Sequence, residues 1–272
     1  MPETGRKSLR CATVQLISYL TPGIPAELFE TLARVIDAEL VLRSDVSGPT
    51  AADDPFRRHE YDLGWMCSTS YVDLTRDAAD PSVALIGVGW VPDDPDAAGR
   101  PVYFGDVVVG PDSAVHSLEE LAGAAIGCND PVSLSGYQAL LIELRDRGHD
   151  PDTWADLRFT GGHHTSLDQV LSGELDAAVV DSVVRLGRSR HDDAVAGLRI
   201  VQRIGPWPTQ PIVARADLAE IDARTIRSQL LRAAADPEIR SVLDAAGIAD
   251  LVPVDVEDYE RLRSSMEAYG FL

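Results

Sequence analysis

A hydroxyl-rich turn at residues 130–137 carries the clearest chemistry in the chain. Asp130-Pro131-Val132-Ser133-Leu134-Ser135-Gly136-Tyr137 follows a short apolar run and opens an amphipathic one. This pattern predicts a strand that ends in a turn at a helix N-terminus, where unpaired N–H groups and the helix dipole attract an anion. We therefore expect the N–H groups of 134–137 and both serine hydroxyls to bind an oxyanion. A serine here is also a common helix N-cap, which needs no ligand.

Polar side chains follow two other predicted strands. Ser68, Ser70 and Tyr71 lie in a polar turn after the strand predicted over 62–66, and Tyr19 follows the first strand. The three turn residues are candidates to close over a ligand from the opposite side of a cleft, and Tyr19 is a candidate lid residue. Ordinary turn chemistry explains the serines equally well.

His163 and His164 follow two glycines, so the backbone lets both imidazoles approach a cleft. We expect His163 to be a structural hydrogen-bonding residue and His164 to contact a ligand. The other histidines lack the spacing of metal ligands, so no metal site is predicted. Asp181 ends an apolar strand, the place where open α/β sheets bind ligands. A carboxylate satisfied within its own loop is the alternative for Asp181.

The chain shows none of the common catalytic or cofactor motifs. It contains no G-x-S-x-G elbow, no Walker loop and no G-x-G-x-x-G. No nucleophile–base arrangement can be recognised either. Catalytic residues and cofactors are therefore not predicted.

The charge of the chain restricts its partners. The 272 residues include 44 acidic and 24 basic ones, and the net charge is −20. Such a field repels nucleic acid and anionic membranes, so neither is expected as a partner. Any anion site must therefore be local and built from backbone dipoles and hydroxyls.

Cysteine usage and hydropathy suggest a cytoplasmic protein as the sequence is written. Cys11, Cys67 and Cys128 are far apart and form no C-x-x-C pair, which favours a reducing compartment. The N-terminus lacks the apolar region of a signal peptide, and no run approaches the ~18 apolar residues of a membrane span. A leader removed beforehand would instead place the protein outside the cytoplasm.

Strands alternate with helices along most of the chain. Strands are predicted at 12–17, 40–43, 62–66, 83–90, 102–109, 124–128, 157–160, 175–181, 200–204 and 212–215. Helices are predicted at 26–38, 137–147, 166–171, 224–235, 237–246 and 256–269, with a short one opened by a capping box at 117–120. The alternation predicts an α/β fold with parallel sheets.

Two proline-rich breaks, at 92–101 and 205–211, predict a chain that crosses twice between two lobes. Residues 1–101 and 208–272 are expected to form a discontinuous lobe 1, and residues 102–207 lobe 2. The two crossings would act as hinges beside a central cleft.

Six short segments, in one order along the chain, resemble the phosphate/phosphite/phosphonate-binding proteins of ABC transporters. They are Asp62-Leu63-Gly64-Trp65, Asp112-Ser113 with Ser117 to Gly123, Asp130 to Gly136, Gly162-His163-His164, Gly173 to Ala178 and Pro211 to Leu218. The resemblance implies the type 2 periplasmic-binding fold, an anion on the 130–136 turn and an ABC permease as partner. The chain departs from the family pattern at Leu134, His164 and Met66, which argues against an aminoalkylphosphonate as the ligand.

Two functions remain from the sequence. The preferred one is a solute-binding protein whose lobes close by hinge motion on a small oxyanion that is phosphate-, phosphonate- or carboxylate-like. The alternative is a cytoplasmic enzyme on the same fold, of lyase or dehydratase type. That enzyme would take its acid–base groups from His163, His164, Asp181 and Cys67.

Overall fold

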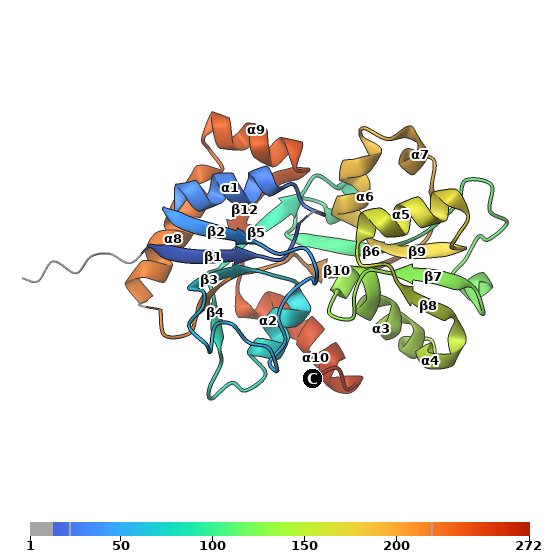
Figure 1. The fold of residues 1–272 in the computed structure, drawn as a ribbon, viewed down its shortest axis with the longest axis horizontal. Coiled ribbons are helices and arrows are strands. Elements are labelled where there is room, and N and C mark those ends of the chain that lie inside the picture. The colour runs from blue at the N-terminus through green and yellow to red at the C-terminus, as the bar shows by residue number, and fades with distance from the viewer. Residues whose placement is uncertain (1–12, 22, 219) are drawn as a thin grey trace, which may run out of the picture.

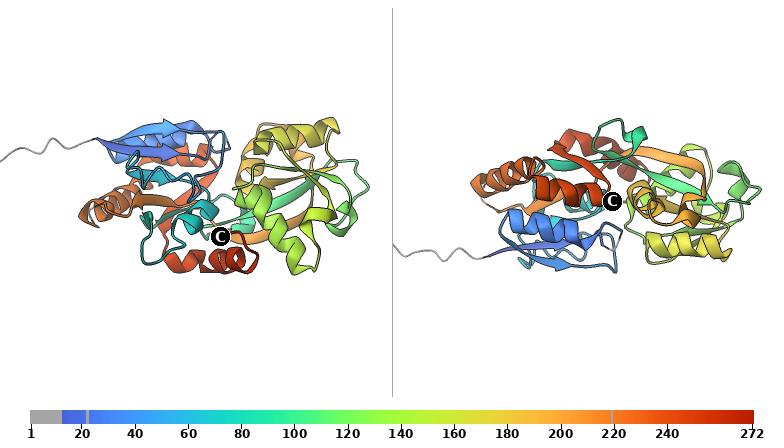
Figure 2. Two further views of the ribbon diagram at one scale, coloured as in Figure 1. Left: turned by 60° about the horizontal axis from the view of Figure 1, so that its bottom comes forward. Right: turned by 90° about the horizontal axis from the view of Figure 1, so that it is seen from above.

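The protein has two α/β lobes joined side by side. The computed structural model describes residues 13–21, 23–218 and 220–272 (Figure 1). Each lobe is built around a five-stranded sheet, and the views of Figure 2 show both sheets from two further sides. The two-lobed α/β architecture predicted from the alternating elements is confirmed.

The sheet of lobe 1 has the strand order β2-β1-β3-β11-β4. Its strands are β1 (Val14–Ser18), β2 (Ala38–Leu42), β3 (Leu63–Trp65), β4 (Val83–Leu85) and β11 (Ile212–Arg215). β1 is parallel to both neighbours, whereas β11 is antiparallel to β3 and β4. The surrounding helices are α1 (Ala26–Val35), α2 (Ser68–Leu74), α8 (Glu220–Ala233), α9 (Pro237–Ala245) and α10 (Glu260–Ala268).

The sheet of lobe 2 has the strand order β10-β6-β9-β7-β8. Its strands are β6 (Val102–Val109), β7 (Ala125–Cys128), β8 (Asp156–Phe159), β9 (Ala177–Asp181) and β10 (Arg199–Pro208). The helices are α3 (Ala139–Asp146), α4 (Pro151–Trp154), α5 (His163–Ser172), α6 (Ser182–Ser189) and α7 (Asp193–Ala196). β7 is parallel to β8 and β9, and its carboxyl end leads into a π-helical turn (Leu134–Gln138).

The two connections between the lobes lie next to each other. The first runs from β5 (Val88–Pro92), which pairs with β12 (Ile248–Pro253), through a 3₁₀ turn (Pro95–Ala97) into β6. The second runs from β10 into β11. Because β6 and β10 are antiparallel partners along most of their length, both connections are held at one edge. The lobe boundaries at 101 and 208 stay a prediction, and the strand membership of the two sheets supports it.

The sequence-based elements were wrong in several respects. The strand predicted at 83–90 is two strands, β4, which pairs with β11, and β5 (Val88–Pro92), which pairs with β12. The sheets are mixed, because β6, β10 and β11 run antiparallel to their neighbours. Cys67 to Tyr71 is not a turn: Ser68, Ser70 and Tyr71 lie in α2. The capping box does not form, because the short 3₁₀ helix Glu119–Leu121 starts after Leu118 without a side-chain cap. The C-terminal region, predicted to be helical throughout, also contains β12.

The core of lobe 1 contains a cluster of aromatic rings beneath α1. Phe29, Trp65 and Trp90 are at most 1% exposed, and their ring centroids are 5.5–6.5 Å apart. α1 buries Leu28 and Leu32 beside them, one turn apart on a single face. Each buried leucine contributes roughly 1.5–3 kcal/mol to stability. This packing fixes the sheet whose strand ends lead toward lobe 2.

The C-terminal residues of lobe 1 lie on α3 of lobe 2. The guanidinium of Arg145 lies 5.5 Å from the ring centroid of Tyr269 and 4.8 Å from that of Phe271. Arg145 also donates to the Tyr269 carbonyl at 3.1 Å, and the Tyr269 hydroxyl bonds Asp146. The two lobes are therefore joined by this contact as well as by the strand connections. Among the described helices, none is long and apolar enough to cross a bilayer.

Gly105 marks the closest approach of β6 to the π-helical turn. A Cβ atom there would lie 2.7 Å from the carbonyl oxygen of Ser135, whereas one at Gly110 would have no neighbour within 4 Å. We expect Gly105→Ala to lower the free energy of unfolding by about 1–3 kcal/mol, as overpacking does. Gly110→Ala is the matched control and should change it by less than ~0.5 kcal/mol. Urea unfolding of both variants checks this, and equal stabilities would contradict the close approach.

Candidate functional site

A cavity of about 260 Å³ lies between the lobes. Lobe 1 lines it with the loops that follow β1 and β2, and lobe 2 lines it with the end of β7, the start of α5 and the end of β9. Of the predicted site residues, Tyr19, Ser133, Ser135, His163, His164 and Asp181 line this cavity. These six come from segments far apart in the sequence, and the two-lobed fold brings them together.

Asp181 is the centre of the polar network beside the cavity. Its side chain is 2% exposed and accepts four hydrogen bonds. Oδ2 accepts from Ser135 Oγ at 3.1 Å and from Gln210 Nε2 at 3.0 Å, and Oδ1 accepts from the N–H groups of Val183 and Val184 at 2.8 and 3.4 Å. Asp181 thus caps α6 and joins the 134–138 turn to the second connection between the lobes.

Burial dominates the ionisation of Asp181. Desolvation raises the pKa of its carboxyl from 3.8 to about 6, although the hydrogen bonds from Val183, Val184, Ser135 and Gln210 act in the opposite direction. The carboxyl group therefore gains a proton on mild acidification, at a pH where an ordinary surface aspartate remains ionised.

His163 is a neutral hydrogen-bond donor at the cavity wall. Burial, and to a smaller extent the neighbouring His164, lowers the pKa of His163 to about 3. Its Nδ1 accepts the backbone N–H of Asp181 at 3.3 Å, so the ring proton must reside on Nε2. Nε2 lies between Cε1, which packs at Gly136, and Cδ2, which lies near Gly23 of lobe 1. His163 thus offers an uncharged N–H beside lobe 1.

The N-terminus of α5 faces the cavity directly. Residues 161–165 all line it, and the N-cap is Gly162, which has no side chain to accept from the first N–H groups. By contrast, the turn at 133–138 is capped internally: Ser133 Oγ accepts from the N–H of Gly136 at 3.2 Å. The helix start predicted at Ser133 is therefore partly satisfied by its own serine, whereas α5 keeps donors for a ligand.

Asp130 holds the turn and contacts lobe 1. Its Oδ1 accepts from the N–H groups of Val132 and Ser133 at 2.9 and 3.0 Å. Its Oδ2 accepts from Asn129 Nδ2 at 2.9 Å and from the hydroxyl of Ser47 in lobe 1. Ser47 also accepts from Asn129 at 3.0 Å. A hydrogen-bonded triad thus connects the lobes at the edge of the cavity.

Two further contacts connect the turn to α2 of lobe 1. The N–H of Leu134 donates to Cys67 Sγ at 3.2 Å, and the Thr69 hydroxyl donates to the Val132 carbonyl. Leu134 is fully buried, so its side chain packs in the interior and offers no hydrogen bond to the cavity. Burial raises the pKa of the Cys67 thiol, which keeps it protonated and poorly nucleophilic.

The other predicted site residues lie away from the described cavity lining. Ser68 Oγ donates to the Pro208 carbonyl at 3.0 Å, and Ser70 is a buried residue of α2. Tyr71 packs on Tyr259 with centroids 5.0 Å apart, and burial raises the pKa of Tyr71 to about 12. Tyr137 packs against Phe159. Leu134, Gly136 and Tyr137 contribute to the turn without lining the cavity.

Sequence reasoning missed several residues of the cavity wall, namely Ser47, Tyr103, Asn129 and Gln210. Tyr103 lies near the start of β6 and Gln210 follows β10, so both lie where the chain passes between lobes. The proline-rich break at 205–211 was a signal for Gln210, since a hinge segment borders the cleft. Ser47 lies in a loop with no local signature.

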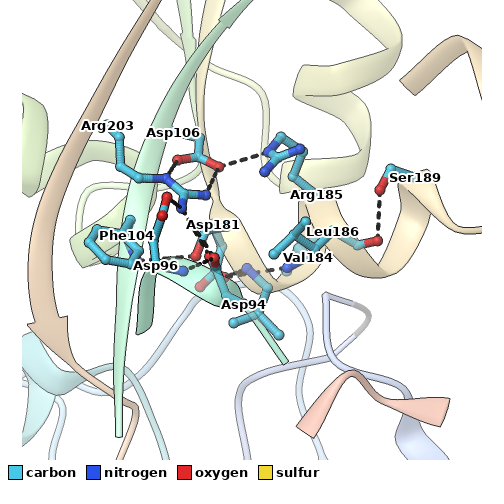
Figure 3. A network of polar contacts seen from close by, with 12 residues as sticks. Asp94, Asp96, Phe104, Asp106, Asp181, Val184, Arg185, Leu186, Ser189 and Arg203 are labelled. Atoms are coloured by element: carbon cyan, nitrogen blue, oxygen red, sulfur yellow. Dashed lines mark hydrogen bonds and ion pairs between the residues drawn. The ribbon is translucent and has the colours of Figure 1, made fainter. Parts of the chain in front are cut away.

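A buried ion-pair network fixes α6 to the connections between the lobes (Figure 3). Asp106 on β6 is fully buried and accepts from the Nε atoms of Arg185 and Arg203, both at 2.7 Å. Arg203 also contacts Asp94 at 3.2 Å and bonds Asp96, in the loop that precedes β6. The helix that starts at the cavity is therefore anchored to both connections.

The described lining of the cavity combines polar and apolar side chains and contains no fixed positive charge. Among the described residues, no lysine or arginine lines it, and no cluster of three or more His, Cys, Asp or Glu could hold a metal ion. Tyr19 lies at its lobe 1 side with Arg43 stacked 5.6 Å from the ring centroid, and burial raises the pKa of Tyr19 to about 12. The described lining therefore offers a ligand hydrogen bonds and backbone dipoles instead of fixed cations.

Comparison with known families identifies the chain. The family model for the periplasmic substrate-binding protein of phosphonate ABC transporters matches residues 25–259. The chain belongs to this family. It is accordingly a solute-binding protein of the phosphonate ABC-transporter type, and the enzyme alternative is not favoured. The family is one of extracytoplasmic proteins, so the cytoplasmic location expected from the sequence has no support.

Solved structures of binding proteins share the fold. PhnD1 of Prochlorococcus marinus, in complex with methylphosphonate, matches with a TM-score of 0.76 and 16% identity over 96% of this chain and 99% of that chain. A binding component of an ABC phosphonate transporter from Pseudomonas aeruginosa has a TM-score of 0.72 and 14% identity, covering 93% and 85%. A Xanthomonas citri protein bound to chloride ion has a TM-score of 0.70 and 19% identity over 95% of this chain and 97% of that chain. A search of curated proteins found no match. The type 2 periplasmic-binding fold is thereby confirmed.

The raised pKa of Asp181 predicts a pH-dependent contribution to the stability of this binding protein. A carboxyl group with a folded pKa of about 6 and an ordinary value of 3.8 stabilises the fold below pH ~4, and that contribution is lost as the pH rises through 6. The shift of roughly two pKa units corresponds to ~3 kcal/mol. The side chain of the Asp181→Asn variant cannot titrate. Between pH 4 and pH 7 the free energy of unfolding of the wild type should therefore fall by up to ~3 kcal/mol relative to that of the variant.

Urea unfolding of wild type and Asp181→Asn at pH 4.5, 5.5 and 7 measures this difference. The other carboxyl groups titrate in both proteins and cancel in the comparison. A difference in unfolding free energy that does not change with pH would contradict the raised pKa.

Proposed function

We propose that this protein binds a small tetrahedral oxyanion, phosphonate- or phosphate-like, in the cavity between its lobes. The observation that carries the proposal is the start of α5, where five successive residues line the cavity and Gly162 leaves the first N–H groups free of a side-chain cap. Aligned N–H groups and the helix dipole favour an anion by about 0.3–2 kcal/mol. The family match and the methylphosphonate-bound relative support the same ligand class.

The proposed site surrounds the anion with donors that carry no formal charge. His163 contributes Nε2–H, and α5 contributes backbone N–H groups. Fixed dipoles inside a cavity need no reorganisation when the anion arrives, so they stabilise it without a lysine or arginine. The 134–138 turn acts as a support, since Ser135 is held by Asp181 and the N–H of Gly136 by Ser133.

Ligand binding is expected to favour the closed arrangement of the lobes. The Ser47–Asp130 and Thr69–Val132 contacts join the lobes beside the cavity, and they form only when the lobes are together. A ligand held by residues of both lobes adds to these contacts and shifts the population toward closure. The proposed partner that distinguishes the closed form is an ABC permease, which would meet this protein at the outer face of the membrane.

A thermal-shift screen tests the proposed ligand class. Phosphate, phosphite, methylphosphonate, sulfate and acetate are each added at increasing concentration. Binding of one tetrahedral anion raises the apparent stability by about 2.7 kcal/mol at 100 times its Kd. Recovery of the ligand unchanged after long incubation separates binding from catalysis. A melting temperature that responds to none of the tetrahedral anions would refute the proposal.

His163 supplies the sharpest single-residue test of the binding mode. His163→Ala removes the Nε2–H donor and should weaken oxyanion binding by roughly tenfold or more, since a hydrogen bond to a charged group contributes about 1.5–3 kcal/mol. His59, which is exposed and close to Asp217, gives the control His59→Ala with unchanged affinity. Isothermal titration calorimetry measures both, after circular dichroism has shown that each variant is folded. If the two variants bind the oxyanion with equal affinity, His163 does not contribute to binding.

A further inference from the structure

Both carboxylates that line the described part of the cavity are fully occupied by protein donors. Asp130 accepts from two backbone N–H groups, one amide and one hydroxyl, and is 8% exposed. Asp181 likewise accepts four hydrogen bonds and is 2% exposed. A carboxylate has about four lone-pair positions, so neither residue has one to spare. A ligand ammonium group would therefore find no free acidic partner on either residue.

Apolar side chains lie beside the anion donors. Leu20, Ile24 and Val46 of lobe 1 line the cavity together with Val184 of lobe 2. The loop that carries Leu20 and Ile24 packs closely on lobe 2, because a Cβ at Gly23 would lie 3.0 Å from Val184 Cγ2. The same Cβ would lie 3.8 Å from the Cδ2 atom of His163. An apolar wall, formed by Leu20, Ile24, Val46 and Val184, thus adjoins the His163 donor.

The cavity has room for more than an oxyanion alone. Its volume of about 260 Å³ corresponds to about nine water-sized groups at ~30 Å³ each. A tetrahedral head uses four or five of these places. About four further non-hydrogen atoms therefore fit in the cavity between the lobes.

We propose that the ligand is an oxyanion with an uncharged apolar substituent of about three to five carbon atoms, seated against the apolar wall, and that the site discriminates against ammonium-bearing analogues. This inference rests on the proposed oxyanion function and adds the chemistry of the other end of the ligand. An alkyl group gains from leaving water, whereas a buried ammonium group would exchange its hydration for a neutral acceptor such as Gln210 Oε1, which has no hydrogen-bond partner within the described protein.

A series of phosphonates tests the substituent by isothermal titration calorimetry at pH 7.5. Methyl-, ethyl-, propyl- and butylphosphonate should bind with a Kd that falls about fourfold per added methylene, equivalent to ~0.8 kcal/mol. 2-Aminoethylphosphonate should bind at least tenfold more weakly than propylphosphonate, which has the same number of substituent atoms. Aminoalkyl compounds that bind as tightly as the alkyl ones would overturn this inference and leave the oxyanion function intact. Absence of binding by every phosphonate would instead refute the oxyanion function itself.

Val46 provides a variant that should reverse the preference. Val46→Asp puts an unpaired carboxylate into the apolar wall and should make 2-aminoethylphosphonate the tighter ligand by at least tenfold over propylphosphonate. Val46→Asn has nearly the same shape without the charge, so it should weaken propylphosphonate without favouring the amine. Leu20→Asp and Leu20→Asn repeat the comparison if a Val46 variant fails to fold. An unchanged ligand preference in a folded aspartate variant would contradict the position of the substituent.

Discussion

The four hydrogen bonds on the carboxylate of Asp181 are the constraint on which the site depends. One group caps α6, fixes the hydroxyl of Ser135 and holds the amide of Gln210, so three separate segments take their positions from a single buried side chain. Removing water from a carboxylate is costly unless its lone pairs are filled, and here all of them are. The raised pKa records the part of that cost that the hydrogen bonds do not offset.

In the proposed site, the residues that support the fold differ from those that would bind the ligand. The acidic residues at the cavity are turned toward the protein, where they organise the 134–138 turn and the contact with Ser47. The donors left for a ligand are neutral, namely the start of α5 and Nε2–H of His163. A protein with a net charge of −20 can attract an anion only through such local dipoles, since its long-range field opposes approach.

Local patterns in the sequence predicted most elements and the cleft, but they could not predict the hydrogen-bond partner of each residue. Ser133 and Ser135 were recognised as hydroxyls at a helix start, yet one caps its own turn and the other bonds Asp181. Those partners depend on tertiary contacts that periodicity does not encode. The sequence of α2 predicted a turn because serine and threonine favour turns. In the structure tertiary packing overrides that preference: Tyr71 packs on Tyr259, and Ser68 donates to the Pro208 carbonyl. Gln210 reaches the cavity only because β10 returns beside β6.

The stacking of Arg145 between Tyr269 and Phe271 has a mechanical consequence for the opening of the lobes. The end of the chain is fastened to α3, so the lobes cannot separate as two bodies joined only by their paired strands. Either the last residues travel with lobe 2 and bend away from α10, or the cation leaves the aromatic rings. The contact of Arg145 with the two rings therefore adds a third connection between the lobes, beyond the two strand connections.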